Sequence, residues 1–169
     1  LEGTLLDIGS GIGALTTELL GAGLSTATCV DLSPSFLAIA KQEAARRGNA
    51  ERMSWYQGDF VLLAPSLPPA DVVVLDRVVC CYPAFSPLLS QAAGRSRRFL
   101  ALSYPRDRWY VRVVLRIENL VRRLRGNGFQ AFVHPVTAME ALLRSRGFTR
   151  ASRSVTLAWS MDVYRRDAA

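Results

Sequence analysis

The stretch LLDIGSGIGALTTELL, Leu5 to Leu20, decides the fold of this chain. A short apolar run at residues 4–8 leads into Gly9, Gly11 and Gly13, after which leucines recur at helical spacing. This pattern predicts a strand, a tight turn and a helix. Glycines permit unusual backbone angles, and the helix that follows offers its N-terminal amides to a ligand. The sequence therefore predicts a binding site at this turn.

Alternating strands and helices are expected along the rest of the chain. The strands expected after the first are 25–30, 52–57, 71–75 and 98–103. The helices expected after the first are 34–47, with Ser33 as its N-cap, 86–93, 107–125 and 137–146. Residues 149–165 predict two more strands, since apolar side chains alternate there. Such an alternation predicts an α/β fold, in which parallel strands are joined by right-handed crossovers.

Four acidic residues stand at or just after the ends of expected strands: Asp7, Asp31, Asp59 and Asp76. In an open parallel sheet, ligands bind outside the carboxyl ends of the strands, at the point where the winding direction reverses. We therefore expect these carboxylates to lie along one edge of the sheet, around the same ligand.

Asp7 bears on the kind of ligand. Gly9, Gly11 and Ala14 also satisfy the G-x-G-x-x-A pattern of dinucleotide-binding folds, so glycine spacing alone does not choose between ligands. A carboxylate two residues before the first glycine would repel a pyrophosphate at a cost of kilocalories. A cationic ligand would instead be attracted, which favours one that carries no phosphate.

The run Asp7-Ile8-Gly9-Ser10-Gly11-Ile12-Gly13 resembles the first motif of the class I S-adenosylmethionine-dependent methyltransferases, acidic-x-G-x-G-x-G. The resemblance extends through 30–33, 57–60 and 71–82 to the two-strand tail. It implies a Rossmann-like three-layer sandwich, with helices on both faces of a mostly parallel seven-stranded sheet whose last strand is antiparallel. It also implies S-adenosylmethionine as the cofactor and a single cofactor-binding domain over residues 1–169.

The same resemblance implies which residues contact the cofactor. They are Asp7, Gly9, Ser10, Gly11, Gly13, Asp31, Leu32, Asp59, Phe60, Asp76 and Arg77. In that family the acid at Asp31 accepts both ribose hydroxyls, the acid at Asp59 lies near the adenine amino group, and an apolar residue such as Phe60 lies beside the ring. The alternative for Asp76 and Arg77 is that they pair with each other.

Residues for the methyl acceptor are expected at Tyr82, Tyr104, Arg106 and His134. Both tyrosines precede a proline just past a strand end, where they would line a pocket or, alternatively, the edge of the core. His134 is the only histidine, and its ordinary pKa would suit a general base, although a structural role is the alternative. No catalytic residue is assigned, and neither a metal nor a covalent intermediate is implied.

The helical segment 107–125 has arginines on one face and apolar residues on another. We expect a solvated face over a stripe that packs on the core. The alternatives are contact with an anionic membrane surface or with an acidic substrate, and such an insertion also suits a substrate lid.

Composition limits the other possibilities. The net charge is +7, but Lys41 is the only lysine, so a general preference for arginine explains the excess without a partner. No nucleic-acid-binding module is recognised. The cysteines, Cys29, Cys80 and Cys81, lack zinc-site spacing and are expected to be reduced, buried thiols in the cytoplasm. The chain starts inside an apolar run, as a fragment without its upstream segment would.

The sequence thus predicts transfer of a methyl group to an oxygen, nitrogen or carbon of a small molecule. The layout after the fifth strand is distantly similar to magnesium-protoporphyrin O-methyltransferases, in which arginines would orient propionates. Two alternatives are an NAD(P)-dependent dehydrogenase and a non-catalytic module that binds S-adenosylmethionine. The oligomeric state is not predicted.

Overall fold

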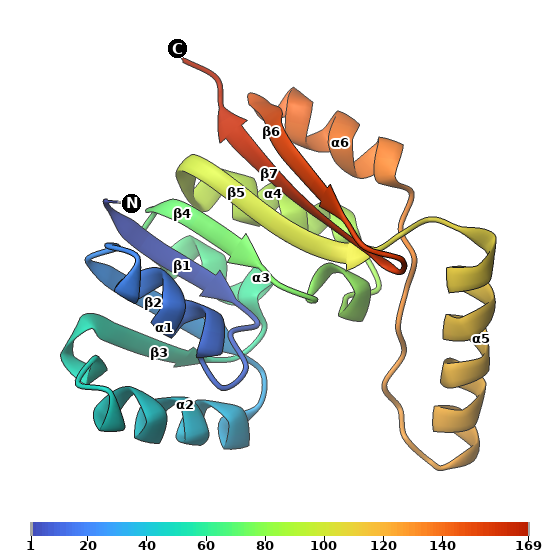
Figure 1. Ribbon diagram of the computed structural model, residues 1–169, viewed down its shortest axis with the longest axis horizontal. Helices are drawn as coiled ribbons and strands as arrows, with labels where there is room; N and C mark the ends of the chain where they lie inside the picture. The colour runs from blue at the N-terminus through green and yellow to red at the C-terminus, as the bar shows by residue number, and fades with distance from the viewer. Residues whose placement is uncertain (1, 169) are drawn as a thin grey trace.

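The computed structural model describes residues 2–168, and its centre is a seven-stranded sheet in the order β3-β2-β1-β4-β5-β7-β6 (Figure 1). The strands are β1 (Thr4–Ile8), β2 (Thr26–Asp31), β3 (Met53–Gln57), β4 (Ala70–Leu75), β5 (Ser96–Pro105), β6 (Phe148–Val155) and β7 (Trp159–Arg166). The α-helices are α1 (Ala14–Gly21), α2 (Pro34–Arg46), α3 (Phe60–Leu63), α4 (Phe85–Arg95), α5 (Trp109–Leu124) and α6 (Val136–Ser145).

Strand directions agree with the sequence prediction. β1 pairs in parallel with both β2 and β4, so the winding direction reverses between β1 and β4. β7 runs antiparallel to β5 on one side and to β6 on the other. The predicted mostly parallel sheet with an antiparallel last strand is therefore confirmed. The reversal at β1 and β4 is where a ligand is expected in such a sheet.

Alternate residues of β1 pack against different helices, because successive side chains of a strand point to opposite faces. Leu6 and Ile8 join a buried cluster that includes side chains from α3, α4 and α6. Leu5 joins a second cluster, with Leu20 of α1 and Ala44 of α2. This alternation fixes Asp7 on the same face as Leu5, directly before the glycine turn.

The face of the sheet that carries Leu5 and Asp7 is only partly covered by α1 and α2. An apolar cavity of about 440 Å³ opens beside α1, lined by Leu15 and Leu19 of that helix and by Phe99, Met161 and Val163 of β5 and β7. The apolar character of β5 and β7 thus continues beyond the part of the sheet that α1 covers.

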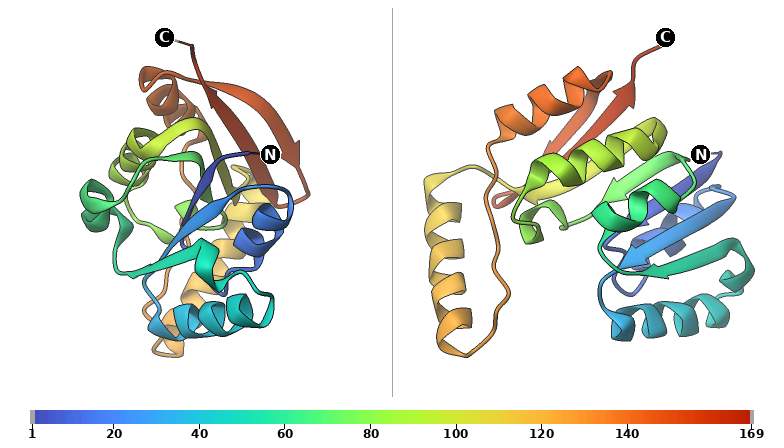
Figure 2. Two further views of the ribbon diagram at one scale, coloured as in Figure 1. Left: turned by 90° about the vertical axis from the view of Figure 1, so that its left-hand side faces the viewer. Right: turned by 180° about the vertical axis from the view of Figure 1, so that it is seen from behind.

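α5 lies beside the sheet, and an extended segment runs back along it between α5 and the rest of the molecule (Figures 1 and 2). We call α5 and this following segment, residues 109–135, the α5 arm. Val111 is the one residue of α5 that is buried. Ile117, Leu120 and Leu124 are all more than half exposed. The expected core stripe is therefore wrong, because the core is completed by α3, α4 and α6 without α5.

None of the helices that the structure describes has the length and apolar character needed to cross a membrane.

Candidate active site

The glycine turn joins β1 to α1 and is held by backbone hydrogen bonds. The Gly9 amide donates to the Val30 carbonyl at 2.7 Å, and the Gly13 amide donates to the Ser10 carbonyl at 2.9 Å. Gly9 has φ +68°, and a Cβ added there would lie 2.3 Å from Cγ2 of Val78. A glycine is needed at this position because of both its backbone angle and its close neighbour.

Asp31 connects the glycine turn to the loop after β2. Its Oδ2 accepts the Gly11 amide at 2.8 Å, and its Oδ1 accepts the Ser33 amide at 2.8 Å. A carboxylate has about four acceptor positions, so each oxygen can still take another donor. Ser33 caps α2 by accepting the Phe36 amide at 3.3 Å, as the sequence predicted.

Asp7 is buried beneath the turn and is not among the cavity-lining side chains. The Thr16 hydroxyl donates to its Oδ2 at 2.5 Å. Burial raises the pKa of Asp7 to about 7; the Thr16 hydrogen bond opposes this shift, while the nearby charges of Asp76 and Asp31 add to it. Three acids therefore give the turn a negative potential, which favours a cation.

Asp59 caps the short helix α3. Its Oδ1 accepts the Val61 amide at 2.8 Å, and the Tyr82 hydroxyl donates to its Oδ2 at 2.9 Å. Burial, and then the hydrogen bond to Asp59, raise the pKa of Tyr82. Phe60 is buried next to this pair. Tyr82, expected on the acceptor side, thus lies beside the residue expected to meet the adenine.

A cavity of about 270 Å³ opens at the carboxyl ends of β1, β2 and β4 and brings most of the predicted cofactor residues together. The predicted residues that line it are Gly9, Asp31, Leu32, Asp59, Phe60, Asp76, Arg77 and Tyr82. Ser10 does not line the cavity, yet its hydroxyl is buried at the turn with no oxygen or nitrogen partner among residues 2–168.

Several residues that line this cavity were not named as site residues from the sequence. Val78 and Cys81 lie within the stretch 71–82 that the resemblance covers, whereas Phe129 lies outside it. Cys81 is exposed, so the expectation of a buried thiol is wrong for it. The hydrogen bond from Cys80, and the charge of Arg122, lower its pKa despite partial burial. Phe129 reaches the cavity only because of the path of the α5 arm, and no local signal indicated it.

Asp76 and Arg77 do not form an ion pair with each other in the part of the chain that the structure describes. The Ser103 hydroxyl donates to Asp76 at 2.5 Å and accepts the Arg77 amide at 2.8 Å. The Arg77 guanidinium lies 5.1 Å from the centre of the Trp159 ring. Both residues also line a neighbouring cavity of about 240 Å³, so they form the wall between the two.

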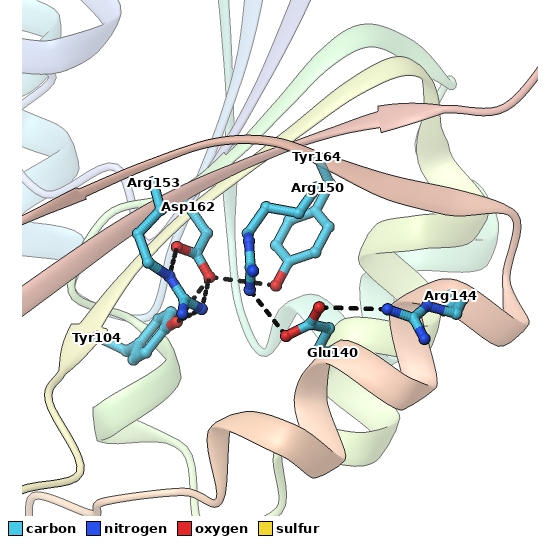
Figure 3. Close-up of polar contacts among 7 residues, drawn as sticks. All are labelled: Tyr104, Glu140, Arg144, Arg150, Arg153, Asp162 and Tyr164. Atoms are coloured by element: carbon cyan, nitrogen blue, oxygen red, sulfur yellow. Dashed lines mark hydrogen bonds and ion pairs between the residues drawn. The ribbon is translucent and has the colours of Figure 1, made fainter.

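Tyr104 belongs to a buried polar network rather than to this cavity (Figure 3). Its hydroxyl donates to Oδ2 of Asp162 at 2.6 Å, and Arg153 donates to both oxygens of that carboxylate at 2.7 Å. Burial alone would raise the pKa of Asp162, but the bonds from Arg153 and Tyr104 lower it. Arg106 donates to the Thr156 carbonyl at 2.9 Å. Tyr104 and Arg106, two of the four predicted acceptor residues, therefore hold β5 to β7 and to the loop between β6 and β7.

His134 supports the loop after β4. Its Nε2 lies 2.9 Å from the Tyr82 carbonyl and 3.0 Å from the Val79 carbonyl. Because carbonyl oxygens only accept, Nε2 carries the proton and donates to them. The ring also packs against Phe85 and Phe132. His134 is not among the described residues that line the 270 Å³ cavity, and a general-base role for it remains a prediction.

No group of three or more His, Cys, Asp or Glu side chains within residues 2–168 is arranged to hold a metal ion.

Comparison with known proteins adds to this geometry. Residues 5–101 match the family described as methyltransferase domain. A curated relative, the probable cobalt-precorrin-6B C(15)-methyltransferase (decarboxylating) of Pyrobaculum aerophilum, is 36% identical over 69 residues. That match covers 39% of this chain and 35% of the relative, so this chain matches about a third of the length of that protein.

Solved structures share the fold over almost the whole chain. Magnesium protoporphyrin IX methyltransferase from Synechocystis PCC 6803 with bound S-adenosylhomocysteine has a TM-score of 0.78 at 23% identity, covering 96% of this chain and 74% of that one. An O-methyltransferase family protein from Burkholderia thailandensis has a TM-score of 0.79 at 18% identity, covering 98% and 51%.

Proposed function

The chain belongs to the methyltransferase domain family, with the class I fold whose cofactor is S-adenosylmethionine, and we propose that this protein moves the cofactor's methyl group to a small molecule. The acceptor atom would be an oxygen, nitrogen or carbon. The observation that carries the proposal is the 270 Å³ cavity, which brings the glycine turn together with Asp31 and Asp59.

The residues around the cavity fit the parts of this cofactor. Asp31 keeps one acceptor position on each oxygen after binding two amides, which suits the two ribose hydroxyls. Asp59 and Phe60 offer an acceptor and an apolar surface to the adenine amino group and ring. The methionine end would lie along Gly9 and Gly11, with the Ser10 hydroxyl, which has no oxygen or nitrogen partner among residues 2–168, close by. Asp7 would supply negative charge beneath the ammonium group.

The bound cofactor supplies a methyl group that is already activated on a sulfonium. The residues of this chain therefore need mainly to hold the acceptor close and in line, and to exclude water. The neighbouring 240 Å³ cavity is the proposed acceptor side, because it shares Asp76 and Arg77 with the cofactor cavity. Its walls include the hydroxyl residues Ser103, Ser154 and Ser160, which suits a polar acceptor.

The dehydrogenase alternative loses its support for two reasons. The family match is to methyltransferases, and the buried carboxylate of Asp7 beneath the turn would oppose a pyrophosphate, although Asp31 would suit either cofactor. The other alternative is a module that binds the cofactor without turnover, and an assay of methyl transfer distinguishes it from an enzyme.

The first test is thermal unfolding with S-adenosylhomocysteine or with NAD. At a hundredfold excess over Kd, a bound ligand stabilises a protein by about 2.7 kcal/mol, and we expect this stabilisation for S-adenosylhomocysteine alone. The second test follows labelled methyl groups from S-adenosylmethionine into a panel of acceptors. The names of the similar proteins make porphyrin-type and precorrin-type macrocycles the first acceptors to include.

Stabilisation by NAD but not by S-adenosylhomocysteine contradicts the proposal. Stabilisation by S-adenosylhomocysteine without methyl transfer to any acceptor favours the non-catalytic module instead. Asp31→Asn provides the control for both assays, because it removes the charge and one acceptor oxygen from the proposed ribose contact.

A further inference from the structure

α5 presents a continuous apolar side that the rest of the described chain leaves open. Six of its apolar side chains are at least 43% exposed: Trp109, Val113, Val114, Ile117, Leu120 and Leu124. At about 100° per residue, they occupy one side of the helix along its whole length. Exposed apolar surface of this extent on one element marks an interaction site.

The opposite side of α5 makes most of its contacts with the molecule; the exception is Tyr110 in the first turn, whose hydroxyl donates to the Leu157 carbonyl at 2.8 Å. Asn119 forms two hydrogen bonds with the backbone of Ala131, at 2.8 and 2.9 Å. Arg122 lies 5.0 Å from the ring centre of Phe129, and Val111 on the same side is buried. Figure 1 and the right-hand view of Figure 2 place the returning segment between α5 and the body. The apolar side therefore points away from the sheet and from the cofactor cavity.

Arginines border this apolar side. Arg112, Arg116 and Arg123 fall in one row at helical spacing, next to Trp109 on the helix surface. Residues 106–125 contain seven arginines and two acids. Both acids form ion pairs, Asp107 with Arg112 and Glu118 with Arg122, which leaves five of the seven arginines without an acidic partner in this segment. A large excess of positive charge thus remains beside the exposed apolar surface.

We propose that α5 lies flat in the headgroup region of an anionic membrane, with its apolar side in the acyl boundary and its arginine row on the lipid phosphates. An apolar face combined with a strongly basic border is the pattern of interfacial helices. Trp109 stands at one end, and tryptophan is enriched at the membrane–water interface. The helix lies on the surface rather than crossing it, because its 16 residues are fewer than the roughly 20 needed to span.

Charge also argues for lipid over a second copy of this chain. Two copies meeting through α5 would bring the same arginine-rich borders together, which opposes association, whereas anionic headgroups would neutralise them. The proposal does not depend on methyl transfer, because every residue that carries it lies outside the cofactor cavity except Phe129, which only supports α5 from behind.

The test is sedimentation of the protein with two kinds of vesicle, pure phosphatidylcholine and phosphatidylcholine containing about a third phosphatidylglycerol. We expect binding to the anionic vesicles only, weakening as salt is raised. Trp109 fluorescence should shift to shorter wavelength on binding, and Trp109→Phe should remove most of that shift. Arg116→Gln with Arg123→Gln should weaken binding by about tenfold or more.

Ile117→Ser, Leu120→Ser and Leu124→Ser together should abolish sedimentation. Leu62→Ser is the matched control, because Leu62 is an equally exposed leucine on α3 and should leave vesicle binding unchanged. The proposal is overturned if the triple variant binds vesicles as the parent does, or if the parent binds neither vesicle. It is also overturned if gel filtration shows a dimer that the triple substitution dissociates while anionic vesicles bind neither form.

Discussion

The glycine turn and the α5 arm differ in where their side chains find partners. At the turn, Asp31 and Asp7 are bonded to groups a short way along the chain, and Gly9 is packed against Val78. On α5, the pattern of apolar residues is at least as regular, but six of those side chains are between 43% and 78% exposed. A periodic pattern therefore identifies a face, while only the neighbouring elements decide what covers it.

The largest expected difference comes from the same substitution made in the core and on α5. Leu100 in β5 is fully buried, whereas Leu120 in α5 is 57% exposed. Leu100→Ala should lower the free energy of unfolding by about 3 kcal/mol, because it leaves a cavity in the core. Leu120→Ala should change it by less than about 0.5 kcal/mol. Urea denaturation of both variants measures the difference. Equal losses would mean that the open side of α5 is covered in solution.

A second pair of variants tests whether the turn, and not the sheet in general, holds the cofactor. Asp31→Asn should weaken S-adenosylhomocysteine binding by about 2 kcal/mol, or about thirtyfold in Kd, because charged hydrogen bonds are lost. Isothermal titration calorimetry gives the value directly.

Asp71→Asn is the matched control for this change. Asp71 is also a half-buried carboxylate that accepts a backbone amide, from Thr4 at 2.8 Å, but it lies at the opposite end of the strands. Its variant should lose stability and keep the affinity within about twofold. An equal loss of affinity in both variants would show that Asp31 acts through the fold rather than at the ligand.

The smallest expected effect is a pH dependence from Asp7. Its pKa is raised from 3.8 to about 7, mainly by burial. Its favourable contribution to stability is therefore complete below about pH 4 and is lost as the pH rises to about 7. Over the range from about pH 6 to about pH 8, cofactor affinity should change in the opposite direction and rise by about tenfold, since the ammonium group favours the ionised carboxylate.

Asp7→Asn separates these two effects. The amide can still accept the Thr16 hydrogen bond but cannot ionise, so the variant should be more stable than the parent at pH 8 and should bind S-adenosylhomocysteine weakly at every pH. Melting curves and calorimetry across the pH range measure both quantities, and the variant also corrects for titration of the ligand itself. The same rising affinity in both proteins would remove Asp7 from the site.

The sequence predicted the sheet, and seven of the eleven residues expected to contact the cofactor line the 270 Å³ cavity, because those features depend on local patterns. The strand before Gly9 and the acids at Asp31 and Asp59 each follow from a few neighbouring residues, and their positions in the cavity follow from strand order. Tyr104 could not be placed in the same way. Its partner, Asp162, lies 58 positions along the chain, and strand pairing over that distance has no local signal.

The same limit explains the missed residues. Phe129 reaches the cavity because Asn119 holds the returning segment against α5. The glycines at 126 and 128 predict a turn but not the direction of the chain after it. His134 looked like a candidate base because it is the only histidine, but only the folded loop shows its two carbonyl partners.

The returning segment of the α5 arm connects α5 with the wall of the 270 Å³ cavity. Ala131 is fastened to α5, Phe129 forms part of the cavity wall, and His134 holds the carbonyls of Val79 and Tyr82. If α5 moves when it binds a partner, these contacts would carry the movement to the cavity wall. Any effect of that partner on affinity at the cavity would then be matched by an equal effect of the cavity's ligand on affinity at α5.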